Sequence, residues 1–360
     1  MRYRGYGYGA YRGRSRSQTV LKVIIVILLI ILIAVAGSYV VLEKFGVYTS
    51  DGFQLKLPFE GGAKDPNVEE SQPLVVVSAD PEPSASPTPE PVTTIQAVKL
   101  PRSALSDGTA ASQVQAAGGS AALFDMKADD GTLGYVSQIA LATETGASAK
   151  DAALNEAIRT LNGGDLYTVA RVSCFRDNTV PYEEPTMGVK TYKDYNWRDN
   201  GNVRWMSPTS AEVRQYVTDV CLELAGLGFD EILLDNSAYP TDGALVNIRP
   251  GDAYDETQFE TIITAFYAQV KAALNAQYPD VKLSIVTDEG VLQNGSNSES
   301  GQSLAGMAAS ADRVWARLEE LPAVEGRNRL VAAGMDGSSL VTVGSQAGAA
   351  GENWAIWPED

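Results

Sequence analysis

Short apolar runs alternate with longer amphipathic segments through residues 92–360 of the chain. Runs too short for a helix, bounded by Gly, Pro or Asp, predict buried strands, whereas apolar residues at intervals of three and four predict helices. The predicted strands lie at 94–99, 121–126, 166–174, 231–234, 282–287, 313–318, 330–333 and 354–357. The clearest predicted helices lie at 147–161, 211–227 and 256–277.

This alternation of strands and helices predicts an α/β fold with a parallel sheet. Eight such units in about 270 residues are typical of a (β/α)8 TIM barrel. An open, doubly wound sheet is the alternative, but no G-x-G-x-x-G or P-loop motif after the early strands favours it.

The segment 228–240 combines a clear strand with the clearest candidate chemistry. Its apolar run, 232–234, follows a glycine break and ends in Asp235 and Asn236, before a loop that closes at Pro240. In α/β proteins the groups at the carboxyl ends of parallel strands form the active site. We therefore expect Asp235 to lie in the mouth of the barrel.

The first 91 residues have a different composition. Residues 1–19 are basic and contain no acid, and residues 20–42 are almost all apolar. An apolar run of roughly 20 residues spans a bilayer, and basic flanking residues stay on the cytoplasmic side. We expect a cytoplasmic tail at 1–19, a transmembrane helix at 20–42, a proline-rich stalk at 43–91 and an extracytoplasmic domain at 92–360. The apolar run 74–77 within the stalk is either an extra strand or a docking patch.

Charge is divided unevenly between these parts. The chain has 28 basic and 45 acidic residues, and six of the basic ones precede residue 23, whereas the first acid is Glu43. The remainder therefore carries 22 − 45 = −23. So acidic a domain is a poor partner for nucleic acid, whereas a polysaccharide meets no such penalty.

The chain contains no histidine, which excludes histidine-based nucleophile systems and histidine metal sites. Cys174 and Cys221 are the only cysteines, and we interpret both as buried small apolar side chains, with a disulfide as the alternative. Carboxylates are therefore the main chemical resource, and we expect neither a metal nor a cofactor.

Four motifs, in order, resemble a known family. They are F-D-M-K-A-D-D-G at 124–131, A-R-V-S-C-F-R-D at 170–177, the segment holding Trp197, Trp205 and Pro208, and G-F-D-E-I-L-L-D at 228–235. Together they resemble a group of bacterial TIM-barrel glycoside hydrolases, DUF4015. This resemblance implies a barrel that hydrolyses O-glycosidic bonds. Two positions depart from the family pattern, because Asn236 stands in place of its tyrosine and Ala238 in place of its arginine.

Glycoside hydrolysis requires two carboxylates on opposite sides of the scissile bond. Asp235 is the candidate nucleophile, at the end of the fourth strand. Glu289 is the first choice for the partner acid and Asp288 the second, because both follow the fifth strand. Such residues also serve as helix caps or loop organisers, and that role is the alternative for each.

Several other residues are candidates for substrate binding. Asp125 and Lys127 lie at the end of the second predicted strand, and we expect one of them to face the mouth of the barrel, with a buried ion pair as the alternative. Arg171 lies in an apolar strand and needs a carboxylate partner, such as Asp125 or Asp235. The remaining candidates are Asn236 and aromatic side chains suited to stacking on sugar rings, namely Tyr239, Trp197, Trp205 and Trp357.

The sequence thus predicts a membrane-anchored, extracytoplasmic glycoside hydrolase that acts on a polysaccharide through paired carboxylates. The alternative is a carbohydrate-binding barrel without catalysis, serving adhesion or cell-wall organisation, which the change at Ala238 favours. A metal-dependent deacetylase or phosphatase is disfavoured by the absence of histidine.

Overall fold

The computed structural model of the chain describes residues 46–49, 52–55 and 94–358. Its contacts divide the chain into two units, Met1–Ala85 and Ser86–Asp360. In the first unit, β1 (Gly46–Thr49) and β2 (Gly52–Leu55) pair as an antiparallel hairpin, within the stretch that the sequence analysis expects to be a stalk. The predicted transmembrane segment 20–42 and the run 74–77 lie outside the described residues. Among the residues that are described, no helix has the length and apolar character needed to cross a membrane.

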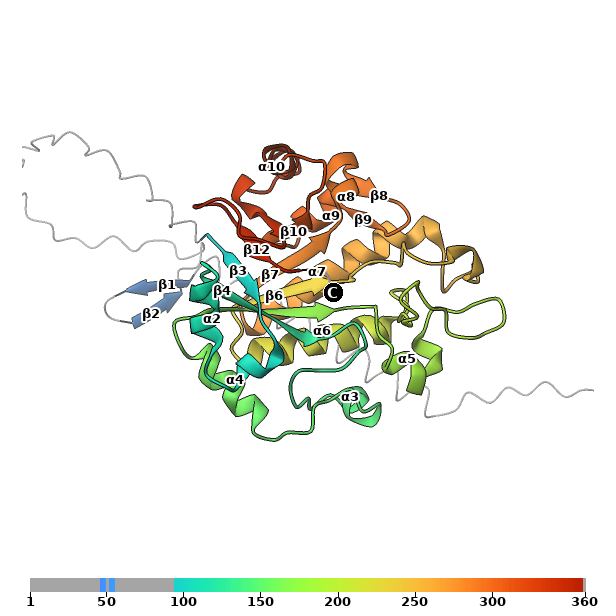
Figure 1. Cartoon of the computed structure of the whole chain (residues 1–360), viewed down its shortest axis with the longest axis horizontal. Coiled ribbons are helices and arrows are strands. Elements are labelled where there is room, and N and C mark those ends of the chain that lie inside the picture. Colours follow the sequence, from blue (N-terminus) through green and yellow to red (C-terminus); the bar gives the residue numbers. More distant parts are fainter. Residues whose placement is uncertain (1–45, 50–51, 56–93, 359–360) are drawn as a thin grey trace, which may run out of the picture. The chain divides into compact units, whose positions relative to one another are not determined.

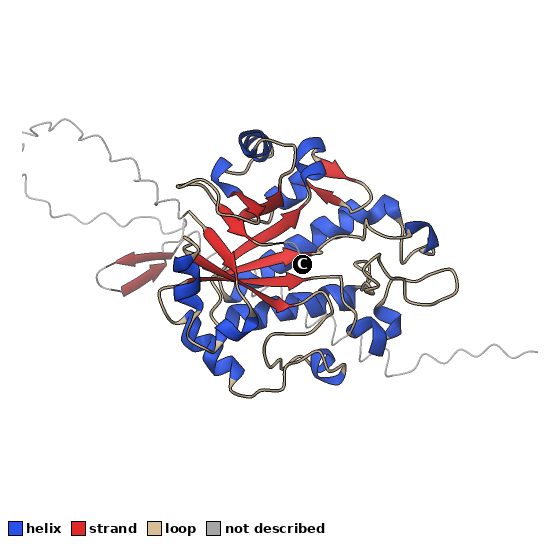
Figure 2. Cartoon of the chain, viewed as in Figure 1, coloured by secondary structure: helices blue, strands red, loops and turns tan. Residues whose placement is uncertain are grey.

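The second unit is a closed barrel of eight parallel strands (Figures 1 and 2), which confirms the predicted fold. Each strand pairs with the next along the chain, and β12 closes the barrel by pairing with β3. The strands are β3 (Gln96–Lys99), β4 (Ala121–Lys127), β5 (Tyr167–Ser173), β6 (Glu231–Asp235), β7 (Lys282–Thr287), β10 (Arg313–Arg317), β11 (Leu340–Gly344) and β12 (Trp354–Ile356).

Helices surround this barrel on its outside (Figure 1). The α-helices are α2 (Ala110–Ala116), α3 (Ala140–Glu144), α4 (Leu154–Asn162), α5 (Val180–Glu183), α6 (Ala211–Gly226), α7 (Phe259–Gln277), α8 (Glu289–Asn294), α9 (Leu304–Ala308) and α10 (Ala323–Ala332). Short 3-10 turns lie at Arg102–Leu105, Pro185–Met187, Leu245–Asn247, Glu256–Gln258 and Gly337–Ser339, and a small hairpin joins β8 (Ser296–Asn297) to β9 (Gln302–Ser303).

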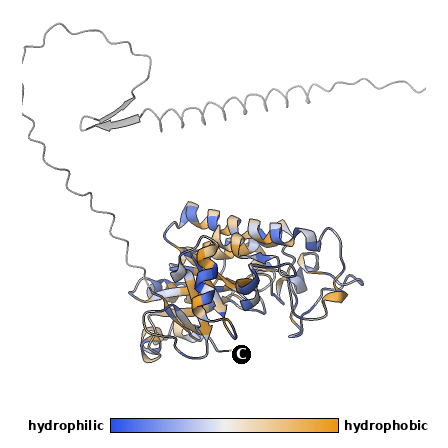
Figure 3. Cartoon of the chain, turned by 90° about the horizontal axis from the view of Figure 1, so that it is seen from above, coloured by the Kyte–Doolittle hydropathy of each residue, from blue (hydrophilic) through white to orange (hydrophobic). Residues whose placement is uncertain are grey.

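Two apolar cores follow from the alternation of side chains along the strands. One set of strand residues packs with the helices, which carry both hydrophobic and hydrophilic positions along their length (Figure 3). The other set fills the barrel interior, where Leu123, Val169, Leu233 and Trp315 are fully buried. The interior is therefore packed, and the open space of the barrel lies beyond the carboxyl ends of its strands.

The prediction of a seventh strand at 330–333 is wrong. Residues 330–332 form the end of α10, and the seventh strand is β11. In α10 only Gly326 and Leu330 are buried, four residues apart as on one helix face, and Val331 is 56% exposed. A four-residue apolar run does not distinguish a helix end from a strand, and here the helical spacing was the better signal. The predicted helix 147–161 is likewise shorter, because α4 begins at Leu154.

Candidate active site

Three charged side chains from neighbouring strands share one layer at the mouth of the barrel. Asp125, Arg171 and Asp235 each lie two residues beyond an interior residue, after Leu123, Val169 and Leu233 respectively. Because side chains alternate along a strand, all three point inward, directly above the packed apolar interior. The strand register brings the three side chains close together. Asp125 pairs with Arg171, and Ser173, which lies two residues after Arg171, pairs with Asp235.

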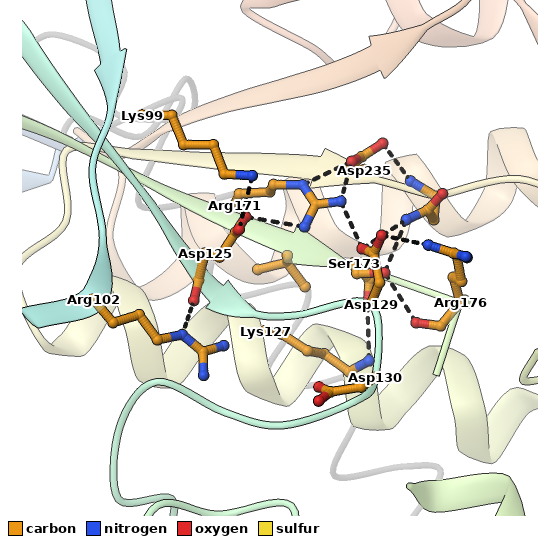
Figure 4. A network of polar contacts seen from close by, with 12 residues as sticks. Lys99, Arg102, Asp125, Lys127, Asp129, Asp130, Arg171, Ser173, Arg176 and Asp235 are labelled. Carbon is orange, nitrogen blue, oxygen red and sulfur yellow. Dashed lines mark hydrogen bonds and ion pairs between the residues drawn. The ribbon is translucent and has the colours of Figure 1, made fainter. Parts of the chain in front are cut away.

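Arg171 is the centre of an ion-pair network (Figure 4). Its guanidinium donates to Asp235 Oδ2 from Nε at 2.7 Å, to Asp125 Oδ1 from Nη1 at 3.0 Å and to Asp129 Oδ1 from Nη2 at 2.6 Å. Burial alone lowers the pKa of Arg171, but the three carboxylates raise it above its ordinary value, so the guanidinium stays charged. The sequence predicted Asp125 or Asp235 as the partner. The structure has both, and it adds Asp129 from the loop after β4.

The network continues on both sides of Arg171. Lys99 Nζ lies 3.2 Å from Asp125 Oδ2, and Arg176 Nη1 lies 2.6 Å from Asp129 Oδ2. Although burial raises the pKa of Asp129, the guanidinium groups of Arg171 and Arg176 lower it below its ordinary range. Trp357 covers the cationic side, with its ring 5.0 Å from the Arg171 guanidinium carbon and 5.4 Å from Lys99 Nζ. Opposite charges therefore fix the position of each carboxylate.

Asn236 shapes the turn that follows Asp235. Its φ of 46° lies in the left-handed region, which Asn adopts more readily than most residues. Its backbone N–H donates to Asp235 Oδ1 at 2.7 Å, and its side-chain amide donates to Ser173 Oγ at 3.0 Å and Asp129 Oδ1 at 3.2 Å. Asn236 therefore orients Asp235 and connects the loops after β4 and β6.

A cavity of about 630 Å³ opens beside this network. Asp235 and Ala238 line it, together with residues 286–290 at the end of β7 and with Arg317, Glu319 and Glu320 at the end of β10. Only 15% of the Asp235 side chain is exposed, so this carboxylate meets the cavity while it stays paired with Arg171. The cavity is large enough for a sugar ring.

The two predicted partner acids both bind backbone groups. Asp288 caps α8, because its Oδ1 accepts from the Val291 N–H at 2.8 Å. Glu289 accepts from the N–H groups of Glu319, of Glu320 at 3.1 Å and of Leu321 at 2.8 Å. These bonds, that from Glu319 above all, lower the pKa of Glu289. Glu289 thus holds the β10–α10 loop, and that loop presents two further carboxylates, Glu319 and Glu320, to the cavity.

Strict alternation would place Lys127 on the same face as Asp125, but the register of β4 shifts between these two residues. Lys127 therefore pairs with Val172 of the outer core and does not line the cavity. Its ammonium pairs with Asp177 at 2.7 Å and donates to the Ser173 carbonyl at 2.8 Å, and both members of the pair are fully buried. Lys127 thus belongs to a buried ion pair, the alternative that the sequence analysis allowed, whereas Asp125 faces the mouth.

The predicted aromatic residues differ in their access to the cavity. Trp205 and Tyr239 line it, but they are only 7% and 2% exposed, and Tyr239 stacks on Phe259 at 3.5 Å. Trp197 is buried and donates from Nε1 to the Ala244 carbonyl at 3.1 Å. Trp357 stays beside the ion-pair network. None of these contacts tests a role in substrate binding, which remains a prediction for each.

No group of three or more His, Cys, Asp or Glu side chains among the described residues is arranged to hold a metal ion. Cys174 and Cys221 are free thiols within the buried core, as expected, and burial raises the pKa of both.

The fold and this carboxylate-rich mouth define a TIM barrel with an enzyme-type site at its carboxyl end. Residues 111–317 match the sequence model of the family DUF4015, described as "Putative glycosyl hydrolase domain". The chain belongs to this family. No curated protein matches the chain.

Solved structures similar to this one include a hypothetical protein from Ruminiclostridium thermocellum, with 26% identity over 52% of this chain and 96% of that one, at a TM-score of 0.45. The galactosidase domain of the alpha-galactosidase-sucrose kinase AgaSK is 14% identical over 74% of this chain, with a TM-score of 0.45, and the match spans only 38% of that chain. The glycoside hydrolase domain of PelA from Pseudomonas aeruginosa is 13% identical over 70% of this chain and 84% of that one, at a TM-score of 0.41.

Proposed function

We propose that the barrel hydrolyses O-glycosidic bonds in a polysaccharide, with Asp235 as the nucleophile. The observation that carries this proposal is the double environment of Asp235. One of its oxygens is fixed by Arg171 and the other by the Asn236 backbone N–H, while the carboxylate borders a cavity that Asp288, Glu289, Glu319 and Glu320 also line. Glycoside hydrolysis requires two carboxyl groups that flank the scissile bond, and a fixed carboxylate in a cavity with further carboxylates can meet this requirement.

The second carboxylate must be protonated when the leaving group departs. Glu289 is poorly suited to this role, because three backbone N–H donors favour its charged form. Glu319 and Glu320 are better candidates. Both line the cavity, and within residues 94–358 neither carboxylate has a hydrogen-bond or ion-pair partner. We therefore assign the acid to one of these two glutamates and a positioning role to Glu289.

The mechanism then divides the work among residues of the chain. Arg171 and Asn236 orient Asp235 for attack on the anomeric carbon from one face of the sugar. Glu319 or Glu320, on the β10–α10 loop that Glu289 holds in place, donates a proton to the leaving oxygen. A carboxyl separation of roughly 5–5.5 Å would give retention, and water activated by the same glutamate would then hydrolyse the glycosyl–Asp235 ester. A separation of roughly 6.5–9.5 Å would give inversion, with Asp235 acting as the base that activates water.

A panel of polysaccharides tests the function, with binding and reducing-end release measured on the full chain. Release from at least one polymer is expected, and Asp235→Asn should abolish it. Binding without release from any polymer would instead support the carbohydrate-binding barrel. The presence of Ala238 where the family pattern has an arginine favours that alternative.

We further propose that residues 20–42 anchor the chain in the cell membrane with the barrel outside. The basic flank at 1–19 and the long apolar run support this orientation. Protease added to intact cells should remove the barrel and spare the N-terminal tail. A barrel that survives such treatment would refute this topology.

A further inference from the structure

The long connection between β5 and α6, residues 174–210, is held in a defined shape. Single antiparallel β-bridges join Arg176 to Trp205 and Gly188 to Met206 at its base. A further β-bridge joins Arg198 to Arg204. This connection therefore presents a fixed surface rather than a loose loop.

Aromatic rings are exposed on this surface. Tyr182, Tyr192 and Tyr195 are 62%, 63% and 72% exposed, and the other large apolar side chains exposed to this degree in the described residues are valines. Tyr182 and Tyr195 line a cavity of about 400 Å³. Exposed rings beside a cavity offer the apolar faces on which sugar rings stack.

The same cavity is lined by three cations, Lys190, Arg198 and Arg204. Their side-chain donors bind neutral oxygens. Lys190 Nζ donates to Asn196 Oδ1 at 2.5 Å, Arg198 Nη1 to Asn202 Oδ1 at 3.0 Å and Arg204 Nη1 to Asn178 Oδ1 at 2.6 Å. Asp194 also lines the cavity, but its carboxylate is paired with Arg249. Among the described residues, none of the three cations has a carboxylate within ion-pair distance.

Nearby positive charges disfavour the charged forms of Arg204 and Lys190. Desolvation lowers the pKa of Arg204, and the charge of Arg198 lowers it further. For Lys190, desolvation lowers the pKa, Asp194 opposes this effect, and Arg249 adds to it. The chain has a net charge of −17, so a local cluster of unneutralised positive charge is unusual in it. A bound anion would neutralise this cluster.

This surface is connected to the candidate active site. Asp199, in the same connection, accepts from Arg176 Nε at 2.6 Å and from Trp205 Nε1 at 3.0 Å. Arg176 in turn pairs with Asp129 of the ion-pair network, and Trp205 lines the cavity at Asp235. One rigid connection therefore contributes to both places.

We propose that a subsite for a carboxylate-bearing polysaccharide is formed by Tyr182, Lys190, Tyr195, Arg198 and Arg204. One part of the polysaccharide binds at this subsite while another part occupies the cavity at Asp235. The inference rests on the proposed function and names the substrate class as acidic glycans. Tyr182 and Tyr195 stack on sugar rings, and the arginines bind carboxylates of uronate residues, with Arg204 already 4.9 Å above the Tyr182 ring.

Affinity electrophoresis of the full chain tests this subsite, with polygalacturonate, alginate, dextran or dextran sulfate in the gel. We expect retardation by polygalacturonate or alginate and none by dextran. Removing the charges in Arg198→Gln/Arg204→Gln, or the rings in Tyr182→Ala/Tyr195→Ala, should weaken the retardation about tenfold. Tyr182→Phe/Tyr195→Phe keeps the rings and should bind like the wild type.

A matched control removes two exposed arginines elsewhere, in Arg159→Gln/Arg329→Gln, and should leave binding unchanged. This control also accounts for the basic N-terminal tail, which every variant retains. Equal losses in the control and the subsite variants would overturn the proposal, because net charge would then explain the binding. Unchanged retardation in Tyr182→Ala/Tyr195→Ala, or retardation by dextran sulfate alone, would also overturn it as simple ion exchange.

The readout does not depend on hydrolysis. A chain that binds polygalacturonate through the tyrosines and arginines but releases no reducing ends supports the subsite and refutes only the proposed hydrolysis. A chain that hydrolyses neutral polymers only, with no retardation by acidic ones, refutes the subsite and leaves the hydrolase.

Discussion

Replacing Asp235 by Asn separates a catalytic role from a structural one. The change removes one charge and keeps the side-chain shape. The Asn oxygen can still accept from Arg171 Nε, but the NH2 group then faces the Asn236 N–H, and that hydrogen bond is lost. A typical hydrogen bond contributes about 0.5–1.5 kcal/mol net. Arg171 also keeps Asp125 at 3.0 Å and Asp129 at 2.6 Å, so no buried cation is left unpaired. The net loss of unfolding free energy should therefore stay within about 1 kcal/mol.

The matched control is Arg171→Met, which leaves three carboxylates around an apolar side chain. Breaking a buried pair by removing one partner costs about 3–5 kcal/mol. For a domain of this size each kcal/mol shifts the thermal midpoint by about 2–4 °C. Asp235→Asn should thus lower the midpoint by at most about 4 °C, whereas Arg171→Met should lower it by roughly 6–20 °C.

The assay combines reducing-end release with thermal unfolding on the same preparations. Loss of a nucleophile lowers kcat by on the order of 10⁴-fold or more. We expect that loss in Asp235→Asn, with binding of the polymer retained. Wild-type turnover in this variant would refute the catalytic assignment. A midpoint as low as that of Arg171→Met would show that Asp235 is mainly structural.

Three further predictions concern the neighbouring groups. If Glu319 or Glu320 is the acid, its Gln variant should lose hydrolysis of unactivated glycosides but retain that of 2,4-dinitrophenyl glycosides, whose leaving group needs no proton; equal losses on both substrates would contradict this. The lowered pKa of Asp129 means that its stabilisation is present above the unfolded-state pKa of about 3.9 and disappears as pH falls through the lower folded value. The stability difference between wild type and Asp129→Asn, measured by urea unfolding, should thus be on the order of 1 kcal/mol at pH 7 and disappear as pH falls below the lowered folded-state pKa, and a constant difference would refute the argument. Lys127→Met leaves Asp177 buried without its cation and should cost about 3–5 kcal/mol, most of which Asp177→Asn should restore in the double variant; no recovery would show that the pair is not the cause.

The barrel was predictable because its strands are short, apolar and separated by helices. The pairing of Arg171 with Asp125 or Asp235 was also predictable, because an arginine within an apolar strand needs a carboxylate partner. Asp129 was missed as a partner because it lies in a loop, where no periodicity indicates direction. The strand β11 was missed because an apolar helix end precedes it and competes for the same assignment.

Contacts between distant residues account for what the sequence could not predict. The cap at Asp288 had a readable signal, an Asp directly before a helix. The bonds from Glu289 to the backbone of residues 319–321 join positions about thirty residues apart, and no local pattern encodes them. Burial of Trp197 had no signal either, because tryptophan serves equally as core and as sugar platform. Sequence reasoning therefore located the mouth of the barrel but not the division of roles within it.

Ala238 decides between the hydrolase and the carbohydrate-binding barrel. The family pattern has an arginine at this position, and Ala238 lines the cavity next to Asp235. Asp235 already has a guanidinium partner in Arg171 at 2.5 Å, so an arginine at 238 is not needed to balance its charge. We expect a wild type that hydrolyses its polymer and an Ala238→Arg variant whose kcat/KM stays within about tenfold, because the cavity of about 630 Å³ has room for the longer side chain. Steady-state kinetics on both chains test this expectation. An inactive wild type that gains hydrolysis in Ala238→Arg would show that the arginine positions substrate, and that its loss turned a catalytic barrel into a binding one.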